Sequence, residues 1–130
     1  MKKALIIDDD TSILRNFSRL LRENDYEVYG VTTGKEAIEQ INKQCFDLLL
    51  IDYVLPDING LEILETIGAK VNEAVKIMIT GFPTLQETAR AFDLGIDSYL
   101  EKPINALDLL SLIKQKTAEK QRKQKNNQPK

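Results

Sequence analysis

Five short strand-like runs alternate with five segments of helical periodicity, and this alternation restricts the fold of the chain more than any other feature. The runs are residues 4–7, 26–31, 48–51, 75–79 and 98–100. Apolar residues between them recur at helical spacing, for example Ile13, Leu14, Phe17, Leu20 and Leu21. This repeated (βα)5 pattern predicts an α/β fold, a doubly wound five-stranded parallel sheet with helices on both faces.

Residues 48–51 are apolar at every position, so this run has no face suited to water. Strands of a parallel sheet that are covered on both sides have this composition. We therefore expect 48–51 to be a central strand, and 98–100 to be a short strand at an edge.

The last two helical segments indicate which of their side chains are buried. The fourth segment contains Ala89, Ala91, Phe92 and Leu94, which we expect to belong to a helix that ends at Gly95. In the last segment, which Asn105 caps, we expect Leu107, Leu110 and Ile113 to form the buried seam, with Leu109 and Leu112 beside it.

Charge divides the chain into two parts. Residues 1–117 carry 13 basic and 19 acidic side chains, whereas residues 118–130 carry five basic and one acidic. An acidic body does not attract nucleic acid through its own field, so we expect no direct nucleic-acid binding. Because residues 118–130 contain no large apolar side chain, we expect a domain of residues 1–117, followed by a disordered basic tail or the start of a linker.

The chain contains no histidine and one cysteine, Cys45, which we expect to be half-buried. This composition excludes His-ligated zinc, Ser-His-Asp and Cys-His catalysis, and a phosphohistidine on this chain. No apolar run reaches the roughly 18 residues of a membrane span, and the first residues do not resemble a signal peptide. These observations favour a cytoplasmic protein that makes no membrane contact.

Polar residues follow four of the five predicted strands. Three aspartates, residues 8–10, follow the first strand, and Asp52 follows the third. Thr80 follows the fourth strand and Lys102 the fifth. Since ligands of open α/β sheets bind outside the carboxyl ends of the strands, we expect these side chains to meet at one edge.

These residue types together suit phosphoryl transfer. Clustered carboxylates repel one another unless a cation is present, and an all-oxygen site without histidine or cysteine favours Mg²⁺ or Mn²⁺. A carboxylate can attack phosphorus to form an aspartyl phosphate. Lys102 offers a positive charge and Thr80 a hydroxyl donor for phosphoryl oxygens.

Four motifs in this order resemble the receiver domain of two-component response regulators. They are residues 6–10 (IIDDD), 52–60 (DYVLPDING), 79–81 (ITG) and 99–103 (YLEKP). The resemblance implies a flavodoxin-like fold of the chemotaxis-regulator type, with strand order 2-1-3-4-5. It also implies a signalling phosphoacceptor rather than an enzyme acting on a small substrate.

The resemblance assigns the chemistry to individual residues. Asp52 matches the phosphoacceptor, which takes a phosphoryl group from a sensor histidine kinase. Asp8 and Asp9 match the acidic pair that binds Mg²⁺ together with Asp52 and the backbone carbonyl of Val54. The chain would then assist its own phosphorylation and dephosphorylation.

The resemblance also implies a switch. Thr80 and Lys102 match the residues that bind the phosphoryl group, the Lys102–Pro103 bond is expected to be cis, and Tyr99 matches an aromatic residue that turns inward. The fourth helix, fifth strand and fifth helix would form the output face, which controls an output domain or a partner protein. Homodimers that depend on phosphorylation occur in the family.

Val54 and Phe82 lie two positions after Asp52 and Thr80, where they should flank the entrance for attacking water. Both are apolar and cannot orient that water, so we expect slow loss of the phosphoryl group.

Two other functions compete with this interpretation. Asp8 and Asp10 partly match the D-x-D-x-[TV] motif of haloacid-dehalogenase-like phosphatases, but Ser12 occupies its last position. A pseudo-receiver that binds partners without phosphorylation is the other alternative. Structural roles are also open: aspartates 8–10 can cap a helix, Asp57 can serve in a turn, and Tyr99 can fill the core.

Overall fold

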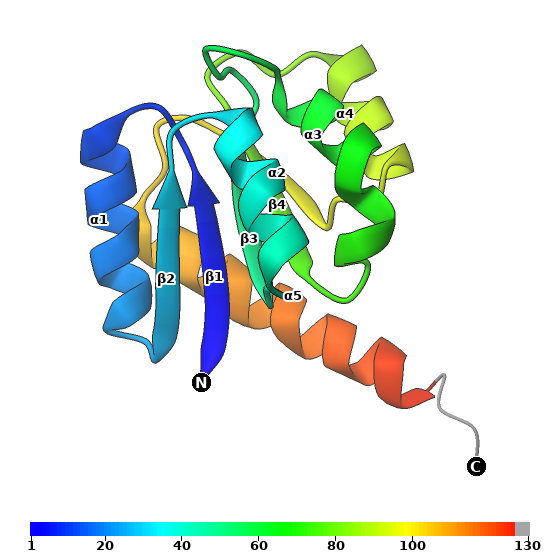
Figure 1. The fold of residues 1–130 in the computed structure, drawn as a ribbon. Helices are drawn as coiled ribbons and strands as arrows, with labels where there is room; N and C mark the ends of the chain where they lie inside the picture. The colour runs from blue at the N-terminus through cyan, green and yellow to red at the C-terminus, as the bar shows by residue number, and fades with distance from the viewer. Residues whose placement is uncertain (127–130) are drawn as a thin grey trace.

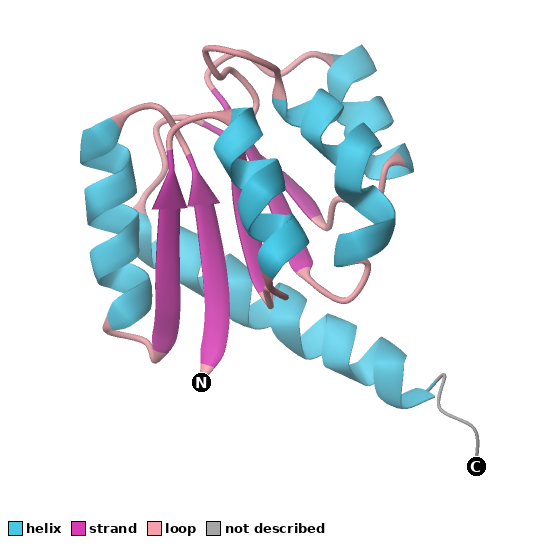
Figure 2. Cartoon of the chain, viewed as in Figure 1, coloured by secondary structure: helices cyan, strands magenta, loops and turns pink. Residues whose placement is uncertain are grey.

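A computed structural model describes residues 1–126 of the chain and the side chains of residues 1–124. Strands and helices alternate along the whole described part (Figures 1 and 2): β1 Lys2–Ile7, α1 Thr11–Arg22, β2 Tyr26–Val31, α2 Gly34–Lys43, β3 Leu48–Asp52, α3 Gly60–Ile67, the short 3-10 helix η1 Gly68–Val71, β4 Val75–Thr80, α4 Leu85–Asp93, β5 Ser98–Glu101 and α5 Ala106–Asn126. Among residues 1–126, no helix is both long and apolar enough to cross a membrane.

The five strands form one parallel sheet in the order β2-β1-β3-β4-β5. The predicted fold and strand order are confirmed. The central strand β3 is buried at every residue, and β5 lies at an edge, as the sequence predicted. This order places β1 beside β3 at the centre of the sheet (Figure 1), so the residues that follow these two strands are neighbours in space.

Two apolar cores cover the two faces of the sheet. Because side chains alternate along a strand, Leu5 and Ile7 of β1 face one core, whereas Ala4 and Ile6 face the other. Helices α2, α3 and α4 contribute to the first core, and α1 and α5 to the second. The predicted helix layers on both faces are therefore confirmed.

Helix α4 buries few of its apolar side chains, and α5 buries fewer of its predicted seam residues than the periodicity indicated. In α4 only Ala91 is buried, and Phe92 is 49% exposed. In α5 the buried residues are Leu109 and Ile113, while Leu107 is 72% exposed. Both helices carry apolar residues around a wider arc than the narrow face that meets the sheet, so spacing alone does not select the buried ones.

Cys45 is exposed, not half-buried as the sequence suggested. It lies after the end of α2, in the connection to β3, where only the following residue, Phe46, packs into the core.

Residues 118–126 are helical, whereas the sequence suggested a disordered tail or the start of a linker from residue 118. Residues 118–126 continue α5, which extends past the strands (Figure 1), and residues 127–130 lie outside the described part. The ammonium of Lys120 donates to the backbone carbonyl of Ala74 at 2.7 Å and to Asp97 Oδ2 at 3.1 Å. These hydrogen bonds hold the end of α5, which lacks large apolar side chains, against the rest of the domain. The spacing of apolar residues in the sequence gives no sign of such polar contacts.

We predict that Lys120→Ala lowers the free energy of unfolding by about 1–2 kcal/mol, because it removes charge-assisted hydrogen bonds from a half-buried site. Lys123→Ala, in the same helix but exposed, is the matched control and should change stability little. Urea denaturation followed by circular dichroism measures both. Equal effects of the two substitutions would show that Lys120 does not anchor α5.

Candidate functional site

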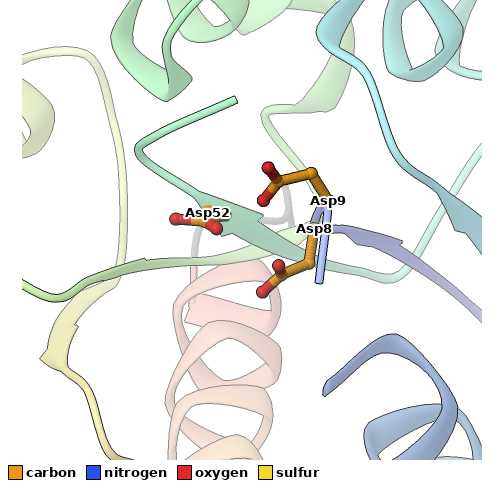
Figure 3. Close-up of side chains that lie close together, drawn as sticks. All are labelled: Asp8, Asp9 and Asp52. Carbon is orange, nitrogen blue, oxygen red and sulfur yellow. The ribbon is translucent and has the colours of Figure 1, made fainter. Parts of the chain in front are cut away.

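Three carboxylates converge at the carboxyl edge of the sheet. Asp8 and Asp9 follow β1, and Asp52 ends β3; one oxygen from each lies within 4.8 Å of the others. Figure 3 shows these three side chains grouped beyond the strand ends. Asp8 and Asp52 are buried, whereas Asp9 is exposed. The predicted cluster exists because β1 and β3 are adjacent in the sheet.

Lys102 reaches this cluster from the loop after β5. Its ammonium lies 3.1 Å from Asp52 Oδ2 and 3.5 Å from Asp8 Oδ2. Burial alone would lower the pKa of Lys102, but the hydrogen bond and charge of Asp52, together with Asp8, outweigh burial and raise that pKa. The backbone N–H of Lys102 donates to the carbonyl of Thr80 at 2.7 Å, which places the lysine at the site. The Lys102–Pro103 bond is cis, as predicted.

The pKa of Asp8 is clearly raised above its ordinary value. Burial raises its pKa from 3.8 to about 6; the backbone N–H of Asp10, at 2.8 Å, opposes this shift, and the charge of Asp52 adds to it. Lys102 also lowers the pKa of Asp8, but not enough to restore its ordinary value. One ammonium therefore compensates only part of the charge of the two buried carboxylates.

The donor set fits a hard divalent cation. Every candidate ligand atom is a carboxylate oxygen, which Mg²⁺ and Ca²⁺ prefer and which suits zinc less well than histidine or cysteine. Asp52 Oδ1 accepts from the backbone N–H of Val54 at 3.1 Å, which orients the Asp52 carboxylate. Residues Asp8, Asp9 and Asp52 could hold such an ion. Its charge would offset the cost of burying the Asp8 carboxylate, the main cause of the raised pKa of Asp8, and also the repulsion from Asp52.

Thr80 ends β4, the strand next to β3, and Tyr99 lies on the edge strand β5. Thr80 is buried, and its hydroxyl oxygen accepts from the backbone N–H of Phe82 at 3.3 Å, which leaves the hydroxyl proton free to donate. The Tyr99 hydroxyl is buried near Thr80 and Thr88 but makes no hydrogen bond of good geometry. Burial, followed by the charge of Glu87, raises the pKa of Tyr99. A buried hydroxyl without a partner is costly, and any rearrangement that gives it one is favoured.

Val54 and Phe82 are unusually exposed for apolar residues, at 61% and 88%. Each is joined through its backbone N–H to a site residue, Val54 to Asp52 and Phe82 to Thr80. Their backbones therefore lie next to Asp52 and Thr80, and their side chains are open to solvent. That they flank the entrance for attacking water stays a prediction.

Asp10 and Asp57 take structural roles. Asp10 caps α1, with its Oδ1 accepting from the backbone N–H of Ser12 at 2.9 Å, as the capping interpretation predicted. Asp57 lies in the loop after β3 but accepts hydrogen bonds from α2. The sequence suggested only a turn residue at this position, and no local pattern signals a contact between positions 22 and 23 residues apart.

Comparison with known proteins assigns the family. Residues 4–114 match the family described as the response regulator receiver domain. The chain belongs to this family of signalling domains of two-component systems.

Individual relatives agree with this assignment. The regulatory protein VanR of Enterococcus faecium is 35% identical over 112 residues, which are 86% of this chain and 48% of VanR. The cell cycle response regulator CtrA of Brucella ovis is 27% identical over 85% of this chain and 48% of its own length. The chain thus spans about half the length of these relatives.

Solved structures match over nearly the whole chain. A CheY-like receiver domain protein from Methanospirillum hungatei JF-1 has a TM-score of 0.90 and 37% identity, covering 95% of this chain and 98% of that chain. The beryllofluoride-activated NtrC4 receiver domain dimer has a TM-score of 0.85 and 30% identity, covering 92% of this chain and 99% of that one. The observed fold is the flavodoxin-like receiver fold.

We predict that Asp8→Asn stabilises the metal-free protein increasingly as pH rises from 4 to 7. The unfolded carboxyl ionises near pH 3.8 and the folded one near 6, so the folded state binds more protons between these values. Wild-type stability contributed by Asp8 therefore falls across this window, whereas asparagine does not titrate. The stability difference should reach about 1–3 kcal/mol at pH 7.

Urea denaturation in the presence of a chelator, at pH 4, 5.5 and 7, measures this difference. Glu65→Gln, which removes a carboxylate from an exposed ion pair with Arg90, is the control and should show no comparable trend. A stability gain from Asp8→Asn that is the same at all three pH values would contradict the prediction.

Proposed function

We propose that this chain accepts a phosphoryl group on Asp52 from a sensor histidine kinase and thereby switches a partner or an output domain. One observation carries the proposal: Asp52 is buried beside Asp8, and Lys102 bridges the two carboxylates. This arrangement leaves a nucleophilic carboxylate oriented and desolvated, with positive charge close to where phosphoryl oxygens would lie. Family membership supports the same role.

Asp8, Asp9, Asp52 and the backbone carbonyl of Val54 would hold Mg²⁺ or Mn²⁺. The bound ion would neutralise charge on the carboxylates and on the phosphoryl oxygens. The all-oxygen donor set supports this assignment, because hard divalent cations prefer such ligands. The Asp8 carboxylate, whose pKa burial and the charge of Asp52 raise, would be stabilised in its ionised form by a bound cation.

The chain's own residues would orient the reacting groups. The backbone N–H of Val54 holds Asp52 Oδ1, and the Lys102 ammonium holds Oδ2, so the nucleophile has a defined direction. Once Asp52 is modified, Lys102 can move its contact to a phosphoryl oxygen. The free hydroxyl proton of Thr80 can bind a second oxygen.

The switch would pass from Thr80 to Tyr99. A Thr80 side chain drawn toward the phosphoryl group changes the surroundings of the unpartnered Tyr99 hydroxyl on the neighbouring strand. The output face would comprise α4, β5 and α5, and the thin packing of α4, with only Ala91 buried, supports a helix that is easily moved. We propose a change in partner affinity or in homodimer formation, not turnover of a small substrate.

The alternatives have less support. A phosphatase of the haloacid-dehalogenase type would leave the contact between Asp52 and Lys102 without a role, and Ser12 does not fit the last position of its motif. A pseudo-receiver would lack part of the acceptor site, whereas Asp52 and Lys102 are both present and in contact.

We predict that incubation with Mg²⁺ and acetyl phosphate adds one phosphoryl group to the wild-type chain, and that base releases it. Asp52→Asn should show no gain, because its amide is not a nucleophile of this kind. Intact-mass spectrometry measures both. An unmodified wild type that still binds Mg²⁺ would support the pseudo-receiver, and steady phosphate release without a modified protein would support the phosphatase.

We also predict a long-lived phosphoryl group that Val54→Asn together with Phe82→Glu shortens. Polar side chains at these exposed positions can orient an attacking water by hydrogen bonding, as valine and phenylalanine cannot. The decay of phosphorylated protein after gel filtration gives the rate. Leu85→Glu, at an exposed apolar position in α4, is the control. Equal decay rates in wild type and double variant would contradict the prediction.

A further inference from the structure

Asp57 joins the loop after the phosphoacceptor to a different helix. Its Oδ1 accepts from the backbone N–H of Gly34, and its Oδ2 from that of Lys35, both at 2.9 Å. Gly34 and Lys35 begin α2, where backbone N–H groups have no partner within the helix. Hydrogen bonds from these two N–H groups lower the pKa of Asp57, so it is ionised at neutral pH and both bonds are charge-assisted.

The loop between β3 and α3 depends on this contact. Its ends are held by the backbone: the N–H of Tyr53 donates to Ile79 at 2.8 Å, and the N–H of Gly60 donates to Tyr53 at 2.9 Å. Within the described part of the chain, the two bonds to Asp57 are the hydrogen bonds that tie residues 55–58 to another element. Val54, Pro56 and Asp57 are exposed, whereas Leu55 and Ile58 are half-buried and pack against the first core.

A close packing contact accompanies the hydrogen bonds. Gly34 is buried, and a Cβ atom placed there would lie 2.3 Å from Cγ1 of Ile58, far inside contact distance. Any side chain larger than that of glycine at position 34 would therefore force the Ile58 side chain to move.

We propose that Asp57 is a positioning residue that holds the loop so that the backbone carbonyl of Val54 faces the cation site. This inference rests on the proposed function, which makes that carbonyl a metal ligand. Val54 lies three residues before Asp57, and Pro56 restricts the backbone between them. Because the start of the loop is held near Asp52 and its middle is held on α2, few orientations of the intervening peptide groups remain.

The test compares Asp57→Asn with Thr33→Ala. Asparagine keeps the size of the side chain but is uncharged and replaces one acceptor oxygen by an NH2 donor. The two N–H groups that now bond to separate carboxylate oxygens would have to share one oxygen, or one of them would lose its partner. Thr33 caps the same helix through the N–H of Glu36 at 3.1 Å without touching the loop, so its loss weakens α2 alone. Isothermal titration calorimetry measures Mg²⁺ affinity, and hydrogen exchange measures protection of residues 55–58.

We expect Asp57→Asn to weaken Mg²⁺ binding by about threefold to tenfold, which corresponds to the net contribution of one hydrogen bond. Exchange in the loop should rise, and phosphorylation by acetyl phosphate should slow at subsaturating Mg²⁺. Thr33→Ala should lower stability but leave both Mg²⁺ affinity and loop exchange within about twofold of wild type, since its cap bond is local to α2.

Gly34→Ala tests the contact from the other side while keeping the charge of Asp57. Alanine is a better helix former than glycine, so local propensity predicts a more stable α2. The added methyl group would, however, displace Ile58 and loosen the loop. We therefore expect faster hydrogen exchange in residues 55–58 and weaker Mg²⁺ binding. If only the charge of Asp57 mattered, Gly34→Ala would bind Mg²⁺ as wild type does.

The outcomes separate this inference from the proposed function. Unchanged loop exchange and Mg²⁺ affinity in both Asp57→Asn and Gly34→Ala, in a chain that is phosphorylated normally, would overturn the inference alone. A wild-type chain that neither binds Mg²⁺ nor takes up phosphate would overturn the proposed function, and the inference with it. Weaker binding in both variants but not in Thr33→Ala supports the positioning role.

Discussion

The ammonium of Lys102 lies between two buried carboxylates, 3.1 Å from Asp52 and 3.5 Å from Asp8, and the chemistry of this edge of the sheet depends on that contact. Two carboxylates buried this close together repel each other, and the lysine offsets part of that repulsion. Burial and the charge of Asp52 still raise the pKa of Asp8, although Lys102 lowers it. A site with two buried carboxylates and one ammonium favours the binding of a further cation. If Asp52 is phosphorylated, as we propose, the ammonium of Lys102 can bind an oxygen of the phosphoryl group.

The parallel sheet positions the residues of this site through the ends of its strands. Asp8, Asp52, Thr80 and Lys102 follow four different strands, and each is placed by a strand end within a rigid, doubly covered sheet. The apolar cores on the two faces supply most of the stability, so the edge can hold groups that repel one another or, like the Tyr99 hydroxyl, lack a partner. Such groups are where a change of charge can alter the structure.

Polar side chains acting over long sequence distances complete the fold. Lys120 fastens the second half of α5 to Ala74 and Asp97, and Asp57 fastens the loop after β3 to the start of α2. Neither residue stands out in its local sequence: Lys120 lies in a run of basic and amide side chains, and Asp57 in a turn. Both satisfy backbone groups that helix or strand ends leave without partners, and their positions decide how firmly these segments are held.

The sequence by itself determined the number, kind and order of the elements, because hydrophobic periodicity is a local property of the chain. Together with its four motifs, it also predicted that Asp8, Asp9, Asp52, Thr80 and Lys102 lie at one edge of the sheet, because the carboxyl ends of parallel strands share an edge. The structure brings Asp8, Asp9, Asp52 and Lys102 together there. Only the tertiary structure decided that Leu109 rather than Leu107 is buried, that α5 continues past residue 117, and that Asp57 caps α2. These outcomes depend on the narrow faces where elements meet and on hydrogen bonds between residues as many as 46 positions apart, which no local pattern encodes.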